Sequence, residues 1–236
     1  MIKFENTEVS GFDAAFRGMR APMNSWNKSD SRYCSGCDTC DGCGNPFVKL
    51  GNEQWVLGKA DKELAQRLIR GGSEHRKFLR QIQVWVDITA PLYWYKELET
   101  YKVGTTSNSC STMHKITAKE FTLDDFSCEH LFTASLNSLK RTIGDLNACR
   151  EEYLDENISR DANLRKAVWW QLIQLLPSSY NQKRTLSMSY ENVRNMYHQR
   201  KNHKLDEWSV GFVQWAESLP FAAELITYTG KEENGQ

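Results

Sequence analysis

The chain has 236 residues, enough to bury one substantial core, and its 30 basic and 30 acidic side chains cancel. No overall field therefore favours nucleic acid or an anionic membrane surface, and we expect neither as a partner. The sequence has no apolar run of about 18 residues and no charged-then-apolar start, so we expect no transmembrane helix, no signal peptide and a cytoplasmic location. We expect one domain over residues 1–228 and a flexible polar tail over 229–236.

The first part of the chain predicts strands and short helices in turn. MIKFENTEV alternates as a strand does, and GFDAAFRGMRAP spaces its apolar residues for a short helix. From Asp61, DKELAQRLIRGG predicts an amphipathic helix that ends at a glycine pair. A strand follows, in which apolar and polar residues alternate from Ile82 to Ile88. Pro91 is tolerated in the first turn of a helix, so APLYWYKELETYK is predicted to be helical.

The later part of the chain predicts longer helices. One carries Leu136, Leu139, Ile143 and Leu146 at helical spacing, and a second runs from Asp161 to Pro177 with Leu164, Val168, Leu172 and Leu175 on its buried face. RTLSMS predicts a short strand, and YENVRNMYHQRK and LDEWSVGFVQWAESL predict two amphipathic helices. The order of elements indicates an α/β (α+β) fold in which a mixed sheet is flanked by long helices.

Residues 98–115, LETYKVGTTSNSCSTMHK, are rich in Ser and Thr and contain one cysteine and one glycine. Aromatic and apolar segments flank the stretch, so we place it inside the folded domain rather than in a linker. Polar groups held there need hydrogen-bond partners. Either the chain supplies them in a network of turns, or a ligand does.

Cys34, Cys37, Cys40 and Cys43 have the spacing C-x2-C-x2-C-x2-C within a loop insertion at 31–46. Four thiolates hold zinc or an iron–sulfur cluster in proteins, and such a site staples a loop because no coordination position stays open. The spacing is tight for zinc, which usually draws two pairs from separate segments. A reduced loop without metal and a disulfide staple are the alternatives.

Two blocks of the sequence resemble the flavin-dependent thymidylate synthases, the ThyX family. VDITAPLYWYKELETYKVGTTSNSCSTM is similar to the family's strand, helix and motif R-H-R-x2-S-x-N-E-x-S-x-R. Counted from Ala90-Pro91, the motif places Arg-His-Arg on Thr100, Tyr101 and Lys102, its first Ser on Thr105, Asn-Glu on Ser107 and Asn108, its second Ser on Cys110 and its last Arg on Thr112. LLPSSYNQKRTLSMSYENVRNMYHQRKNHKLDEW is similar to a later block, whose N-x-R matches Asn192 and Arg194 and whose last arginine falls near His203 or Arg200.

The resemblance implies a mixed α/β fold, a homotetramer, FAD between subunits and dUMP beside the flavin, with methylenetetrahydrofolate as carbon donor and NADPH as reductant. It implies a cofactor role for His75, Tyr101, Lys102, Thr105, Asn192 and His198. It implies a role in binding a phosphorylated nucleotide for Asn108, Cys110, Thr112, Arg194, Arg200 and His203. Cys110 is the candidate catalytic residue, since a thiol of depressed pKa attacks a pyrimidine ring carbon; a small packed residue is the alternative.

The chain departs from the motif at positions that carry charge in the family. Thr100, Tyr101 and Lys102 leave one point charge where two guanidinium groups would stand, and Thr112 removes a phosphate clamp. Diphosphate binding would weaken by about 1.5–3 kcal/mol for each lost contact. Asn108 exchanges a pure acceptor for a donor and an acceptor, which suits a different base edge.

Several basic and aromatic residues have two interpretations. The basic residues of the second block suit an anionic ligand or form a solvated surface; they are Lys183, Arg184, Arg194, Arg200, Lys201, His203 and Lys204. His75 and His114 contact phosphate or flavin, or are structural. The aromatic residues at 93–95 and 169–170 stack a planar ring, or belong to a core or subunit interface.

The sequence thus predicts a flavin- and pyrimidine-nucleotide-binding enzyme that transfers a methyl or one-carbon group to a deoxyuridylate-type nucleotide. The alternative is a protein that keeps the fold but only binds or sequesters a nucleotide, as a phage-borne or regulatory protein would. A metal-stapled interaction module is a third interpretation, based on the cysteine loop alone.

Overall fold

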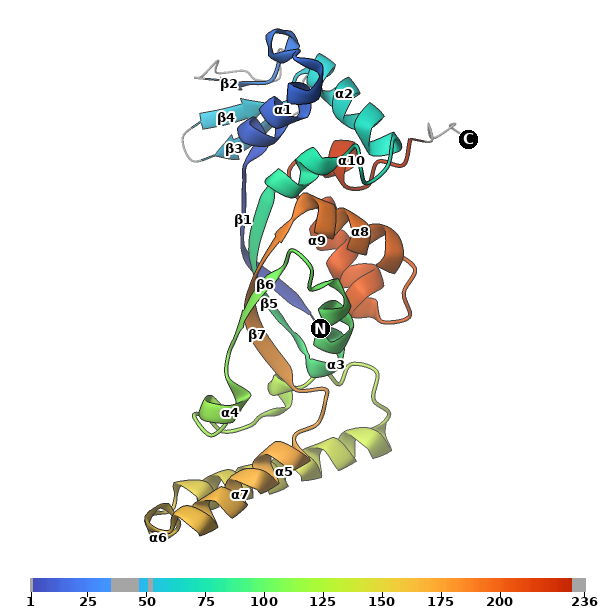
Figure 1. The fold of residues 1–236 in the computed structure, drawn as a ribbon. Coiled ribbons are helices and arrows are strands. Elements are labelled where there is room, and N and C mark those ends of the chain that lie inside the picture. The colour runs from blue at the N-terminus through green and yellow to red at the C-terminus, as the bar shows by residue number, and fades with distance from the viewer. Residues whose placement is uncertain (1, 35–46, 51–52, 231–236) are drawn as a thin grey trace. The chain divides into compact units, whose positions relative to one another are not determined.

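The computed structural model describes residues 2–34, 47–50 and 53–230. A four-stranded sheet has the order β1-β5-β7-β6 (Figure 1), formed by β1 (Lys3–Ser10), β5 (Gln83–Pro91), β7 (Asn181–Ser189) and β6 (Thr106–Ser109). In β5, Val84, Val86 and Ile88 are buried while Trp85 is exposed, which confirms the predicted alternation. The predicted α/β (α+β) fold class, with long helices beside a sheet, is confirmed.

The chain divides into two compact units. Unit 1 comprises residues 1–3, 87–100 and 107–185, and unit 2 comprises residues 4–86, 101–106 and 186–236. The single domain over residues 1–228, with its insertion at 31–46 and tail at 229–236, stays a prediction.

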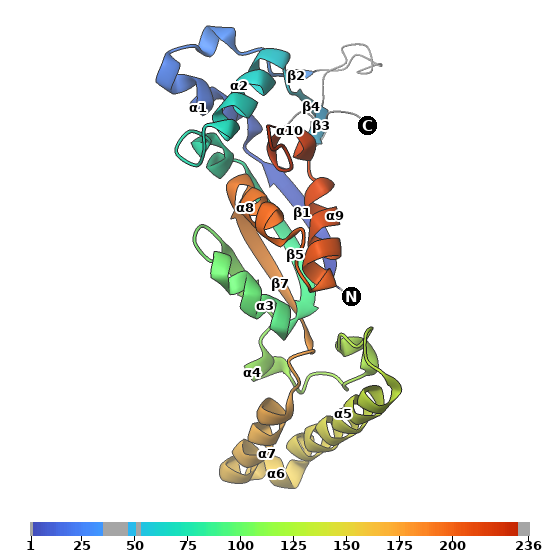
Figure 2. The ribbon, with the colours of Figure 1, turned by 90° about the vertical axis from the view of Figure 1, so that its right-hand side faces the viewer.

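Unit 1 contains two long helices, α5 (Thr133–Leu154) and α7 (Ala162–Leu175), joined through the short α6 (Glu156–Arg160). The two long helices lie side by side in both views (Figures 1 and 2). Its other helices are α3 (Leu92–Leu98) and α4 (Thr112–Lys115), with 3-10 turns at Glu99–Tyr101 and Leu123–Asp125. The core of this unit consists of Ile116, Phe121, Phe126, Leu139, Ile143, Leu146 and Leu172.

The predicted buried faces of the long helices are confirmed in part. On α7, Val168 and Leu172 are buried, whereas Leu164 and Leu175 are exposed. The helix therefore buries the middle of the predicted face and leaves its first and last members exposed. Pro91 is the N-cap residue of α3 in extended conformation and not its first helical residue.

Unit 2 is built around aromatic side chains. Its helices are α1 (Phe12–Arg20), α2 (Lys59–Arg70), α8 (Tyr190–Arg200), α9 (Val213–Glu217) and α10 (Ala222–Leu225), with a 3-10 segment at Lys77–Gln81 and a π-helical segment at Glu207–Phe212. Phe12 stacks on Trp55 with ring centroids 5.4 Å apart and contacts Tyr190 and Phe221 edge-on. These rings fill the space between α1, β4 and α8, so α1 and α8 share one core.

A second, three-stranded sheet in unit 2 has the order β2-β4-β3 and is antiparallel, formed by β2 (Arg32–Cys34), β4 (Glu53–Val56) and β3 (Phe47–Leu50). We did not predict this sheet, because a cysteine-rich sequence with turn residues reads as a loop. Cys37, Cys40 and Cys43 lie outside the described residues. Within the described ranges no group of three His, Cys, Asp or Glu side chains is placed to hold a metal ion, so a metal at the cysteine loop stays a prediction.

None of the helices in the described part of the chain is both long and apolar enough to cross a membrane.

Candidate functional site

The hydroxyl-rich stretch divides into two segments with different surroundings. We call Tyr101–Thr106, in unit 2, the anchored segment, and Ser107–Thr112, in unit 1, the open segment. The first contacts α8 through several side chains, whereas the second is mostly exposed. Each is described within its own unit.

Tyr101 fastens the beginning of the anchored segment to the end of α8. Its hydroxyl accepts a hydrogen bond from Arg200 Nε at 2.8 Å and donates to Gln199 Oε1 at 2.8 Å. The Arg200 guanidinium also lies over the Tyr101 ring at 5.3 Å and over the Trp208 ring at 5.4 Å. This cation–π arrangement fixes Arg200 beside the segment, where the resemblance places a nucleotide ligand.

Asn192 fastens the middle of the anchored segment. Its Nδ2 donates to the Val103 carbonyl at 2.8 Å, and its Oδ1 accepts from the Ser189 hydroxyl at 2.6 Å in a capping box at the start of α8. Gly104, with φ +76°, passes close to the same side chain: a Cβ there would lie 3.3 Å from Asn192 Oδ1. Asn192 therefore holds the backbone of the loop, and both ends of its amide have protein partners.

Thr105 and Lys102 complete the anchored segment. The Thr105 N–H donates to the Lys102 carbonyl at 3.2 Å, and its hydroxyl donates to the Tyr101 carbonyl at 3.3 Å, so the segment closes as a turn. The Lys102 side chain is exposed. It is the one cation that the motif comparison leaves in place of two arginines, and it stays accessible to an anion.

Arg194 is buried on the inner face of α8, at 7% exposure. Its Nη1 donates to the carbonyls of Ile226 at 2.7 Å and Leu225 at 3.3 Å, while its Nε has no partner among the described residues. Burial and the positive charge of Arg76 lower the pKa of Arg194 to about 10, and the Glu191 carboxylate acts in the opposite direction. Because Arg194 is buried and Lys201 is exposed, the two side chains do not share a solvated helix face on which they could bind one anion together.

Three residues that the sequence did not single out surround Arg194 and organise α8. Arg76 Nε bonds both oxygens of Glu191 at 3.1 Å, and its Nη2 donates to Asn195 Oδ1 at 3.1 Å. Glu191 is 6% exposed, so its charge is neutralised within the protein. Arg76 follows His75 in the segment SEHRKF, but nothing in the sequence identifies its partner on α8. His75 is exposed and packs near Gly71.

The side chains of His198 and His203 both contact backbone groups of the protein. His198 Nε2 lies 3.0 Å from the Ile226 carbonyl, and burial together with the charge of Arg194 lowers its pKa. His203 Nδ1 accepts from the Leu205 N–H at 3.1 Å just after α8 ends. The roles that the resemblance implies for these two residues stay predictions.

The open segment is an accessible strand and turn in unit 1. All residues of β6 are exposed, and Asn108 lies on it. The Cys110 N–H donates to the Lys183 carbonyl at 2.9 Å and its carbonyl accepts from Gln182 Nε2 at 2.7 Å, so the backbone is fixed while the side chain is exposed. Thr112, half-buried, begins α4, which the Ser111 hydroxyl caps.

A hollow of about 660 Å³ begins directly after the open segment. Met113 and His114 line it from α4, Arg165, Lys166 and Trp169 from α7, and Tyr153 from α5. Trp169 Nε1 donates to the Met113 carbonyl at 3.1 Å, and the Arg165 guanidinium lies 4.6 Å from the Tyr153 ring centroid. The combination of cations and aromatic faces suits a planar ligand that carries negative charge.

The two basic residues of β7, Lys183 and Arg184, interact with other side chains of the protein. Lys183 Nζ lies 3.4 Å from Asp87 Oδ2, and Arg184 lies over the Tyr95 ring at 3.8 Å and bonds Gln182 at 2.8 Å. Trp94 and Tyr95 are core residues, whereas Trp170 is 43% exposed. The aromatic run at 93–95 is thus a core feature for its last two members.

No family model and no curated protein matches the chain. Two solved structures of thymidylate synthase X (ThyX) from Helicobacter pylori, both with FAD and dUMP, are similar to it. One is 17% identical with a TM-score of 0.58 and covers 96% of this chain and 96% of its own; the other is 17% identical with a TM-score of 0.60 and covers 96% and 97%. The likeness extends over nearly the whole chain and shows that the fold is ThyX-like.

Proposed function

We propose that this chain is a ThyX-like enzyme that binds a flavin and a pyrimidine nucleotide and transfers a methyl or one-carbon group to a deoxyuridylate-type nucleotide. One observation carries the proposal: in a ThyX-like fold, an exposed segment with Asn108 and Cys110 leads directly into a hollow lined by cations and aromatic rings. The similar H. pylori proteins hold FAD and dUMP, which gives the ligand class.

In this proposal the open segment reads the nucleotide. Asn108 offers both a donor and an acceptor to a base edge or a ribose hydroxyl. Cys110, held by two backbone hydrogen bonds with its thiol exposed, lines the face of the reacting pyrimidine. The phosphate interacts with Arg165 and Lys166 in the adjoining hollow, and Thr112 contributes a neutral donor where the family has an arginine.

The anchored segment and α8 fit an anionic cofactor with fewer cations than the family uses. Lys102 is exposed, and Arg200 is held on Tyr101. When bound, FAD would supply reducing equivalents. Tyr101, Thr105, Asn192, His75 and His198 would shape its surroundings, and Lys102 would bind a phosphate oxygen.

Mass spectrometry of the small molecule released from purified protein by denaturation tests this proposal, together with the absorption spectrum of the native protein. We expect a yellow protein that releases FAD, and dUMP binding that weakens about tenfold when Asn108 is replaced by Ala. A colourless protein that neither takes up added FAD nor binds dUMP would refute it.

A second candidate, a nucleotide-binding protein without catalysis, is favoured by one observation. Arg194, which matches a family position, is buried and directed at the carbonyls of Leu225 and Ile226 rather than at an accessible surface. Release of a nucleotide without flavin, with dUMP binding that survives replacement of Cys110 by Ser, would support this candidate. A homotetramer, expected from the resemblance, belongs to the enzyme proposal and is tested by the mass of the protein in solution.

A further inference from the structure

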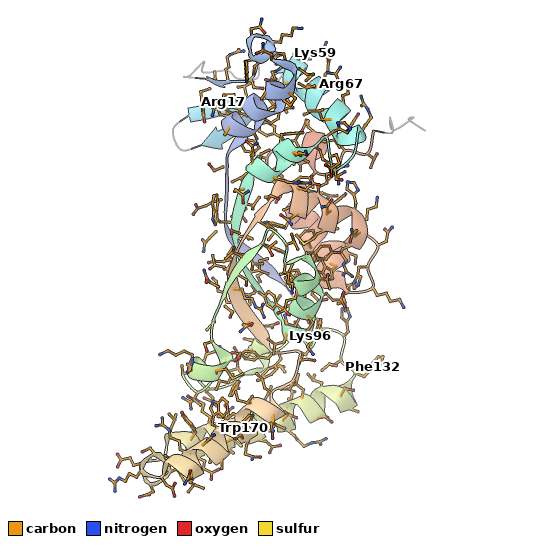
Figure 3. The ribbon with its side chains drawn as sticks, in the orientation of Figure 1. Arg17, Lys59, Arg67, Lys96, Phe132 and Trp170 are labelled. Carbon is orange, nitrogen blue, oxygen red and sulfur yellow. The ribbon has the colours of Figure 1, made fainter. Side chains whose placement is uncertain are left out.

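A second hollow, of about 460 Å³, lies in unit 2 and shares no residue with the sites proposed above. We call it the aromatic hollow; its walls are Phe16 from α1, Trp26 from the turn that follows and Trp55 from β4. Arg20, on the last turn of α1, borders it as well. Arg17, on the same helix and labelled in Figure 3, also lines the hollow.

The aromatic walls suit a flat ligand. The rings of Phe16 and Trp55 pack with centroids 5.1 Å apart and are buried, so this part of the hollow is rigid. Trp26 is 50% exposed, which leaves its indole face available on the solvent side. A planar ring that lies on this indole gains stacking contacts there, above a floor that does not move.

Two buried donors on side chains that line this hollow have no acceptor among the described residues; one of these side chains, Arg20, also lines a neighbouring hollow of about 330 Å³. Arg20 is 4% exposed; its Nε donates to Asp61 Oδ1 at 2.6 Å, but its Nη2 has no hydrogen-bond partner among the described residues. Trp55 is fully buried, and its Nε1 is likewise without a partner in that part of the chain. Buried N–H groups are nearly always satisfied in native proteins, so both donors point to a missing acceptor.

Asp61 does not supply an acceptor for the remaining Arg20 nitrogen, because Arg20 Nη2 makes no hydrogen bond to it in this structure. It accepts from Arg20, from the Ser29 hydroxyl at 2.7 Å and from the Ser31 N–H at 3.0 Å. Burial alone would raise the pKa of Asp61, but the hydrogen bonds from Ser31, Ser29 and Arg20 lower it below its ordinary value. The carboxylate is therefore ionised and offsets the charge of Arg20.

The charges around the aromatic hollow cancel. Asp61 neutralises Arg20, and at the rim Asp13 Oδ2 lies 3.2 Å from Arg17 Nη1. A ligand that brings its own negative charge would stand close to the Asp61 carboxylate without an unpaired cation to compensate it. The hollow is thus rich in donors but has no net charge, which favours a neutral acceptor such as a carbonyl oxygen.

We propose that the aromatic hollow binds a neutral, planar ring compound that carries a carbonyl oxygen. The carbonyl accepts a hydrogen bond from Arg20 Nη2, and the ring stacks on the exposed indole of Trp26. Specificity comes from the donor, since a ring of the same shape without an acceptor leaves Arg20 unsatisfied.

Benzamide is a suitable probe, with toluene as a match that lacks the acceptor and benzoate as a match that carries a charge. Binding to the full chain is measured by ligand-detected NMR and by quenching of tryptophan fluorescence. Arg20→Lys keeps a cation opposite Asp61 but removes the free guanidinium nitrogen. Trp26→Ala removes the accessible wall, and Trp85→Ala is its control, because Trp85 is also exposed, at 40%, but lies on β5 outside the hollow.

We expect benzamide to bind at least about fivefold more tightly than toluene or benzoate, and Arg20→Lys and Trp26→Ala each to weaken it at least about fivefold. Trp85→Ala should leave benzamide binding unchanged. The proposal is overturned if benzamide binds a folded Arg20→Lys variant as well as the wild type, if benzoate or toluene binds as tightly, or if Trp85→Ala has the same effect as Trp26→Ala. Should Arg20→Lys fail to fold, as a melting curve will show, the toluene comparison and Trp26→Ala decide. FAD release and dUMP affinity are unaffected by Trp26→Ala under this proposal, so its failure is separable from that of the enzyme proposal.

Discussion

The anchored and open segments are adjacent in sequence and similar in composition, yet the protein treats them differently. Two hydrogen bonds join the anchored segment to α8: Arg200 donates to the Tyr101 hydroxyl, and Asn192 donates to the Val103 carbonyl. In the open segment, the backbone of Cys110 is bonded but the side chain of Asn108 has no partner among the described residues. Polar composition alone does not distinguish a structural loop from a binding loop. The distinction depends on whether each polar side chain already has a hydrogen-bond partner within the protein.

The difference assigns a role to each half. A segment whose polar atoms are used internally contributes shape and position, and a change there costs stability. A segment with fixed backbone and free side chains can exchange water for a ligand at little structural cost, and a change there costs affinity. The following variants test whether this separation holds, from the largest expected effect to the smallest.

The largest loss of stability is expected when the ion pair beneath α8 is broken. Glu191→Gln leaves the Arg76 guanidinium without its buried counter-charge and removes the carboxylate that stabilises charged Arg194. We expect the free energy of unfolding to fall by about 3 kcal/mol. Urea denaturation followed by circular dichroism measures the change.

Glu74→Gln is the matched control, since Glu74 pairs with Lys77 on the surface, where the glutamate side chain is 80% exposed. That variant should change the free energy of unfolding by less than about 0.5 kcal/mol. Equal effects of the two substitutions would show that α8 does not depend on the buried pair.

Gly104→Ala tests the turn of the anchored segment. Gly104 has φ +76°, and an added Cβ would lie 3.3 Å from Asn192 Oδ1, so the methyl group strains the backbone and presses on the side chain that holds the loop. We expect a loss of about 1–2 kcal/mol in the free energy of unfolding, measured by urea titration.

Two other glycines separate the causes. Gly72, with φ +98° and open space around its Cβ position, reports backbone strain alone. Gly144 lies within α5 and also has open space at its Cβ position. Gly144→Ala should therefore raise the free energy of unfolding by up to about 1 kcal/mol. If Gly104→Ala costs no more than Gly72→Ala, the contact with Asn192 has no energetic weight.

Asn108→Ala tests the open segment from the opposite side. Because this side chain is exposed on β6, its loss should leave the melting temperature unchanged. The affinity for dUMP should fall by up to about tenfold, as expected for one neutral hydrogen bond, measured by calorimetry. Asn192→Ala should show the reverse pattern, with a stability loss of about 1–2 kcal/mol from the broken cap and loop anchor. An Asn108→Ala variant that melts early but binds normally would contradict the division of roles.

Much of this architecture was predictable because local rules agreed with tertiary packing. The alternation from Ile82 to Ile88 became β5, and the apolar spacing around Val193 and Met196 became the buried face of α8. The β2-β4-β3 sheet was missed because its strands are short and the sequence between β2 and β3 is rich in Gly and Asp, which are typical of turns. Short strands owe their existence to pairing across distant positions, which periodicity does not report.

The helix that carries Asn192 and Arg194 was predictable, but the contacts of these two candidate residues were not. The resemblance placed Asn192 and Arg194 together on one helix, which the structure confirms, since both lie on α8. It did not show that Arg194 is directed at the carbonyls of Leu225 and Ile226, because those partners come from a segment some thirty positions later in the chain. The sequence around a single basic residue does not indicate whether its side chain binds a ligand or a backbone carbonyl. The burial of Arg194 therefore became known only from the structure.

The smallest effect concerns His198, which lies against the Ile226 carbonyl on the anchored side of the comparison. Burial first, and then the positive charges of Arg194, Lys201 and Arg76, lower its pKa from the ordinary value of 6.5, while the Ile226 hydrogen bond acts in the opposite direction. The folded protein thus holds His198 neutral at pH values where the unfolded chain binds a proton. The contribution of His198 to the free energy of unfolding is therefore complete above pH 6.5. It decreases as the pH falls below that value, until His198 binds a proton in the folded state as well.

His198→Gln removes the titrating group but keeps a donor for the Ile226 carbonyl. The free energy of unfolding, measured by urea titration at several pH values, should decline less steeply below pH 6.5 in this variant than in the wild type. The difference in slope cannot exceed about 1.4 kcal/mol per pH unit for one proton. Identical slopes for wild type and His198→Gln would mean that His198 takes up its proton equally well in both states, and that this end of α8 is open to solvent rather than closed by the backbone at Ile226.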